Sequence, residues 1–137
     1  MKKIKLFVLF LIVLGTSEKL FAQYDLDVHN NNSSCSATID FSTVYNCCNT
    51  STSTGNSVAN GTSVTLYSSI SYCATILEVF TATVTIGGNK VTVGNTSPPC
   101  SFSAGSASQW VIDCGGNSIN VTFLPATSTA NALLTIN

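Results

Sequence analysis

Apolar and polar residues alternate one by one along much of the second half of the chain. The clearest cases are two ten-residue segments, 84–93 and 112–121, which align without a gap, and each carries Gly-Gly-Asn at its centre. A period of two indicates a strand with one buried face. Glycine and asparagine accept the positive φ angles that a tight hairpin turn requires. The repeat therefore predicts two antiparallel β-hairpins of the same design.

A two-residue loop at each Gly-Gly pair determines which residues face each other across the hairpins. The facing pairs are then Val84 with Val91, Ile112 with Ile119, and Trp110 with Val121. Trp110 shares its predicted strand face with Ile112, so we expect the indole to pack in the core. Stacking of Trp110 on a ligand is the alternative.

The same alternation predicts shorter strands elsewhere in the chain. They are 24–28, 35–41, 64–66, a strand or two within 72–86, and 132–136. Segment 49–57 (NTSTSTGNS) is polar and without periodicity, which predicts a loop. Pro98-Pro99 ends any strand before it, because proline has no amide proton to donate.

About seven to eight short strands, with turn signals between them and no helical period, favour an all-β fold. We expect an antiparallel β-sandwich with immunoglobulin-like layering, braced by disulfides. A small β-barrel is the alternative. Residues 23–137 are short enough to form a single domain.

Residues 1–22 are predicted to be a secretory signal peptide. Lys2, Lys3 and Lys5 precede the apolar run 6–14, and Ala22 is the expected cleavage point. The run is much shorter than the roughly 20 apolar residues of a membrane-spanning helix, so we expect no membrane span. The short, lysine-led segment resembles the signals of Gram-negative bacteria. We therefore expect a secreted or cell-surface protein, with the periplasm as the alternative compartment.

Export changes the charge of the chain. The mature protein keeps Lys90 as its single cation and has no arginine, against five acids, so its net charge is −4. The acids are Asp25, Asp27, Asp40, Glu78 and Asp113. Nucleic-acid binding requires clustered lysine and arginine. We therefore expect no nucleic-acid partner.

Six cysteines remain after export. They are Cys35, Cys47, Cys48, Cys73, Cys100 and Cys114. An even number of cysteines in a small exported domain predicts disulfides. The pairing stays open, although Cys100 with Cys114 is the single pair we favour and adjacent Cys47 and Cys48 should reach different partners. Zinc would need Cys-x-x-Cys spacing or histidine partners, and neither occurs.

Asp25 and Asp27 are expected on one side of the first strand, with His29 in phase and asparagines at 30–32. Carboxylate and amide oxygens are ligands that Ca²⁺ accepts, so a calcium site is one hypothesis. A solvated acidic edge is the other, and we expect no further cofactor. His29 is the only histidine, and no Gly-x-Ser-x-Gly motif accompanies it. We predict that the protein is not an enzyme.

Tyr67 is out of phase with Val64 and Leu66, so we expect it to be exposed beside Thr65. An exposed ring among hydroxyls and amides can stack on a sugar. The predicted function is a secreted binding or adhesion module that recognises an extracellular glycan or a surface protein. The alternative is a structural subunit that self-associates into a layer or filament by strand addition at sheet edges, with segment 24–28 as the donor.

Overall fold

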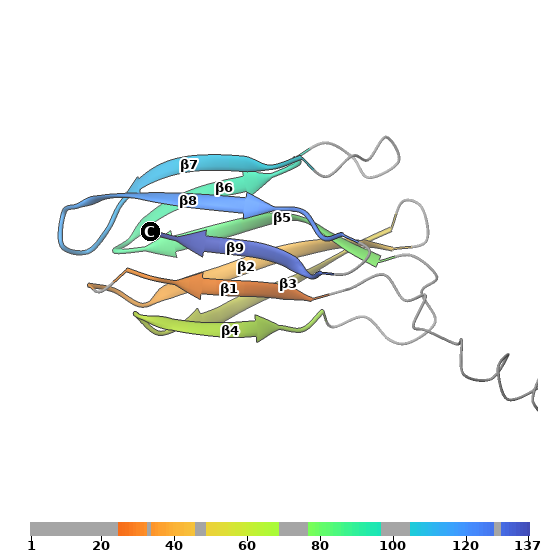
Figure 1. Cartoon of the computed structure of the whole chain (residues 1–137), viewed down its shortest axis with the longest axis horizontal. Coiled ribbons are helices and arrows are strands. Elements are labelled where there is room, and N and C mark those ends of the chain that lie inside the picture. Colours follow the sequence, from red (N-terminus) through yellow and green to blue (C-terminus); the bar gives the residue numbers. More distant parts are fainter. Residues whose placement is uncertain (1–24, 33, 46–48, 69–76, 97–104, 128–129) are drawn as a thin grey trace, which may run out of the picture.

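The computed structural model describes residues 25–32, 34–45, 49–68, 77–96, 105–127 and 130–137. Within these ranges the chain forms nine strands and no helix (Figure 1). The strands are β1 (Leu26–Asn30), β2 (Ala37–Tyr45), β3 (Asn49–Val58), β4 (Thr62–Leu66), β5 (Leu77–Ile86), β6 (Asn89–Gly94), β7 (Ala107–Ile112), β8 (Ser118–Leu124) and β9 (Ala132–Ile136). The predicted signal peptide, the Pro98-Pro99 pair and Cys47, Cys48, Cys73 and Cys100 lie outside the described residues. No helix in the described ranges is long and apolar enough to cross a membrane.

The nine described strands form two sheets. One has five strands in the order β4-β1-β9-β8-β7, and the other has four in the order β3-β2-β5-β6 (Figure 1). The predicted two-layer all-β architecture is confirmed. The described strands do not close into the single barrel that was the alternative.

The core lies between the two sheets and is built by the alternation seen in the sequence. Inward side chains of β8 and β9 meet those of β2 and β5, and nearly all are fully buried. The largest fully buried side chains, which include Leu26 of β1, are Phe41, Phe123, Leu26, Ile39, Ile86, Leu134 and Ile136. Burying one such side chain contributes about 1.5–3 kcal/mol relative to leaving it in water.

The first hairpin has the predicted register. Val84 lies opposite Val91, and the turn between β5 and β6 consists of Gly87 and Gly88 at φ angles of +57° and +84°. A two-residue hairpin turn of type I′ requires positive φ at both central residues, and glycine adopts it without steric cost.

The register predicted for the second hairpin is wrong by one residue. Val111, not Ile112, lies opposite Ile119, and Trp110 pairs with Asn120. The physical reason is Asp113, whose carboxylate accepts hydrogen bonds from turn amides and so opens a wider loop, 113–117. A slip of one residue turns every side chain of a strand to the other face. Trp110 and Ile112 are consequently 68% and 46% exposed instead of buried.

Segment 49–57, predicted to be a loop, lies in strand β3. It pairs along its length with β2, and the Ser42 and Thr52 hydroxyls share a hydrogen bond of 2.9 Å. The strand has no apolar period because it is a sheet edge, where Val58 is its one buried residue. Threonine nevertheless favours extended backbone, since its branched side chain fits a pleated surface.

The five-stranded sheet is mixed, whereas an antiparallel sheet was expected. β1 pairs in parallel with β9 and antiparallel with β4, so it lies inside the sheet. Leu26 and Val28 of β1 are fully buried. The segment expected to serve as a donor for a second chain is therefore engaged within its own.

A disulfide joins Cys35 to Cys114, so the favoured pairing of Cys100 with Cys114 is wrong. The two cysteines are 79 residues apart, and their Cα atoms are 6.0 Å apart. Cys35 precedes β2 in one sheet and Cys114 follows β7 in the other, so the bond ties the two layers together. Closing a loop of this length is worth about 4.5 kcal/mol in the chain-entropy model.

Candidate functional site

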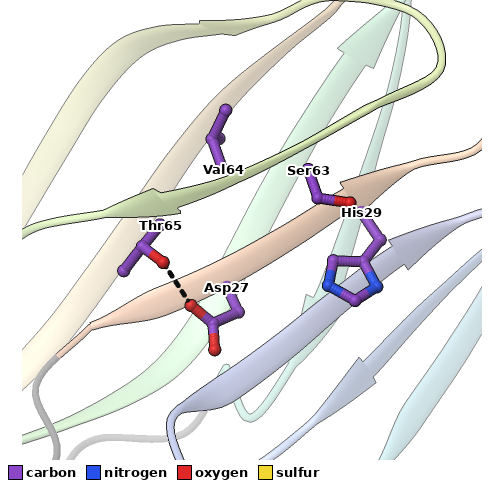
Figure 2. A pocket seen from close by; sticks show the side chains of 5 residues that line it. All are labelled: Asp27, His29, Ser63, Val64 and Thr65. Carbon is purple, nitrogen blue, oxygen red and sulfur yellow. Dashed lines mark hydrogen bonds between the residues drawn. The ribbon is translucent and has the colours of Figure 1, made fainter.

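The outward face of β1 and β4 carries most of the polar residues singled out from the sequence. Asp27 lies opposite Thr65, and His29 lies opposite Ser63. With Val64 these four residues line a shallow hollow of about 290 Å³, which we call the β1–β4 hollow (Figure 2). The core positions of β1 alternate with these residues, which is why the same strand supplies both the core and the hollow.

Two donors hold the Asp27 carboxylate in place. The Thr65 hydroxyl donates a hydrogen bond of 2.6 Å to Asp27 Oδ1 (Figure 2), and Asn131 Nδ2 donates one of 3.2 Å to the same oxygen. The donors come from β4 and from the residue before β9, so three segments meet at this carboxylate. Ligand binding by Thr65 stays a prediction, and the hydrogen bond shows that Thr65 orients Asp27.

Asp25 is half-buried beside this hollow. Burial raises the pKa of Asp25, and the neighbouring negative charge of Asp27 raises it further. No group of three or more histidine, cysteine, aspartate or glutamate side chains gathers within the described ranges. The two carboxylates thus gain no third acidic or imidazole ligand there, and the calcium hypothesis stays a prediction.

Tyr67 directly follows β4 and is 72% exposed, as its phase in the sequence predicted. Thr65 and Tyr67 are both exposed while Leu66 between them is half-buried, so the strand alternation continues to Tyr67. Residues two apart on an extended chain are about 7 Å apart on the same side. Tyr67 therefore lies on the same side of the chain as Thr65, which lines the β1–β4 hollow.

Polar side chains continue from the hollow across the whole sheet. Neighbouring strands place one polar residue each in register, which gives a continuous polar row on the outward face. The row runs Ser63, His29, Thr135, Thr122, Ser108. Asn120 lies beside it and connects two of its members, because it donates to Ser108 Oγ at 2.8 Å and accepts from Thr122 Oγ1 at 2.7 Å.

Trp110 is the residue that the sequence reasoning misplaced. It lies at the β7 edge of the same sheet, paired with Asn120 and thus next to the polar row. Among the described residues, the four large hydrophobic side chains that are exposed all lie on this sheet or directly follow one of its strands. They are Tyr67, Trp110, Ile112 and Leu124. The aspartate before the second Gly-Gly pair was the signal that could have revealed the exposed indole.

Ser63, His29 and Asp27 are the residue types of a hydrolase triad, and all three line the β1–β4 hollow (Figure 2). In the described part of the chain, however, no hydrogen bond joins His29 to Ser63, whereas Asp27 binds Thr65 and Asn131. A triad needs the base within hydrogen-bond reach of both partners. The hollow thus contains the three residue types of a triad, but they are not joined by the hydrogen bonds of a triad in the described part of the chain.

Comparison with family models, with curated proteins and with solved structures finds no match to this chain.

Proposed function

We propose that this protein is a secreted, non-enzymatic binding module of a bacterial cell exterior that recognises a glycan. The main support for this proposal is the continuous polar row across the five-stranded sheet, with the exposed Tyr67 at its β4 side. The proposal includes an immunoglobulin-like layering of the two sheets, an architecture common among cell-surface domains.

The row suits an extended, uncharged polymer. Strands are about 4.8 Å apart, so five of them span roughly 19 Å, enough for several sugar rings. Hydroxyl, amide and imidazole groups along the row can donate to and accept from sugar hydroxyls. The ring of Tyr67 offers an apolar face for stacking and loses little conformational entropy on binding.

The Cys35–Cys114 disulfide supports the proposed location, since disulfides persist in oxidising compartments outside the cytosol. The signal peptide expected at residues 1–22 supports the same location. Both apply equally to a secreted, a surface-attached and a periplasmic protein.

The test is a glycan array probed with the mature domain, followed by titration of the best glycan. Tyr67→Ala should weaken binding by about tenfold, because an exposed aromatic anchor is lost. Thr83→Ala is the matched control, since Thr83 shares a hydrogen bond with Thr92 on the other sheet. Retention of no glycan, or equal binding by Tyr67→Ala, would refute the proposal.

An activity assay on the same protein tests the prediction that it is not an enzyme. Incubation with the retained glycan should release no product over hours. Turnover that disappears in Ser63→Ala would instead mean that Ser63, His29 and Asp27 act as an enzyme.

Self-association is tested on a sizing column. Because β1 lies inside its own sheet, assembly would have to use edge strands such as β3 or β4. We expect the proposed module to elute as a monomer at every concentration. Concentration-dependent polymers would favour the structural-subunit alternative.

A further inference from the structure

A second hollow lies where the edges of the two sheets meet. β6, at the edge of the four-stranded sheet, runs beside β7, at the edge of the five-stranded sheet (Figure 1). Asn89 Nδ2 donates a hydrogen bond of 2.8 Å to the carbonyl oxygen of Ile112 and so joins the two edges. The hollow, which we call the seam hollow, has a volume of about 270 Å³. It is lined by Asn89, Lys90, Trp110, Val111, Ile112 and Ser118.

Trp110 and Ile112 give the seam hollow an apolar wall that remains in contact with water. They are the residues that the one-residue slip at Asp113 turned outward, while Val111 between them is buried. An indole is the largest flat apolar surface that a side chain can offer, and its edge carries an N–H donor. Such a wall suits a ring with one apolar face and polar edges.

Lys90 gives the seam hollow a positive charge. It is the only cation of the mature chain, which has five acids, and its side chain is exposed. Its ammonium offers three N–H donors and no acceptor. Asp113, which directly follows Ile112 of the hollow, is buried, and both of its carboxylate oxygens accept hydrogen bonds. The hollow therefore combines one cation, one aromatic wall and the Ser118 hydroxyl.

We propose that the seam hollow binds an acidic saccharide, a hexuronate unit whose ring stacks on Trp110 and whose carboxylate pairs with Lys90. A neutral sugar would leave the ammonium without a partner of opposite charge. A highly charged polyanion would need several cations, and the mature chain has one. A single carboxylate on one pyranose ring matches the one cation and the one aromatic wall of the seam hollow.

This inference rests on the proposed function, since both ligands are glycans, but it adds a second site and a ligand class. The two sites are at opposite edges of the five-stranded sheet, with Tyr67 beyond β4 and Trp110 on β7. The polar row lies between these edges. A polymer that carries uronate units among neutral sugars could therefore occupy the row and the seam hollow together.

The experiment is isothermal titration of the mature domain with an oligomer that carries one hexuronate among neutral sugars, and with the same oligomer after reduction of its carboxyl group. Trp110→Ala should weaken binding of the acidic oligomer by about tenfold. Lys90→Gln should weaken it by about two- to fivefold, as expected for an exposed charge pair. Lys90→Gln should leave the reduced oligomer unaffected, and Lys90→Arg should restore the preference. High salt should remove the advantage of the acidic oligomer in the wild type.

Several outcomes would overturn the inference. If Tyr67→Ala abolishes binding of the acidic oligomer and Trp110→Ala does not, the ligand lies at the other edge, so the proposed function stands and the seam site fails. If the wild type binds only neutral glycans, the acidic specificity fails. If Trp110→Ala converts a dimer into a monomer, the seam hollow is an interface between copies. Trp110 is mostly exposed, so the variant should keep the circular dichroism spectrum of the wild type.

Discussion

Asp113 determines the conformation of the second hairpin and, through it, the position of Trp110. Its carboxylate accepts hydrogen bonds from Asn32 Nδ2 at 3.0 Å and from the amides of Gly115 and Asn117 at 2.8 Å each. An aspartate that binds amides two and four residues on is a recognisable turn former. The alternation of apolar residues alone could not reveal this, because it is equally regular in both registers. The residue types of the site were predictable, and the side of β7 that reaches solvent was not.

We predict that Asp113→Asn destabilises the protein at neutral pH. The variant places an amide N–H₂ or a weaker acceptor where Asn32 and the turn amides need a carboxylate. Hydrogen bonds from Asn32, Asn117 and Gly115 lower the pKa of Asp113 below its value in the unfolded chain. Its contribution is therefore complete above about pH 4 to 5 and is lost as the pH falls through the folded-state pKa.

Thermal unfolding across pH checks this prediction. The midpoint of the variant should lie several degrees below that of the wild type at pH 7, and the gap should narrow below about pH 4. Asp40→Asn is the control, because Asp40 accepts one backbone bond, from Gly55, and is only half-buried. A gap that is constant with pH would contradict the role assigned to the Asp113 carboxylate.

At the scale of elements, a strand was predictable where one face is buried and not where both faces are polar. Strands β8 and β9 alternate strictly and were expected, as was the β5–β6 hairpin. β3 was missed because it has almost no buried side chain, so no apolar period marks it, and its pairing with the preceding strand β2 holds it in the sheet. The two Gly-Gly-Asn turns look alike in sequence, yet they differ in structure because an aspartate precedes only the second.

The turn of the first hairpin packs against the turn of the second, and Gly87 makes this possible. A Cβ atom at Gly87 would lie 2.5 Å from the backbone nitrogen of Cys114 and 2.8 Å from its Cα. A Cβ at Gly88, also at positive φ, would meet nothing within 4 Å. Gly88→Ala should therefore cost about 1–2 kcal/mol, for the left-handed backbone alone.

Gly87→Ala should cost at least about 1–3 kcal/mol more than Gly88→Ala, because overpacking adds to the backbone strain. Urea denaturation of both variants measures the difference. Equal losses in the two variants would show that the turns of the two hairpins do not press on each other as described.

At the scale of the molecule, the two-layer all-β architecture followed from the sequence, whereas the contacts between distant segments did not. The parallel pairing of β1 with β9 and the Cys35–Cys114 bond join residues that no local pattern relates. The same pairing brings His29 and Thr135 side by side, which makes the polar row continuous. The candidate site therefore depends on the strand topology, which the sequence did not reveal, although its residue types could be read from the sequence.

The central claim is that a glycan binds along the outward face of the five-stranded sheet. Amide chemical-shift mapping of the ¹⁵N-labelled mature domain, titrated with the glycan retained on the array, tests it most directly. We predict shifts at Ser63, Thr65, Tyr67, His29 and Thr122, with Thr83 and Thr92 of the other sheet unchanged. Shifts confined to the four-stranded sheet, or uniform line broadening from self-association, would contradict the account.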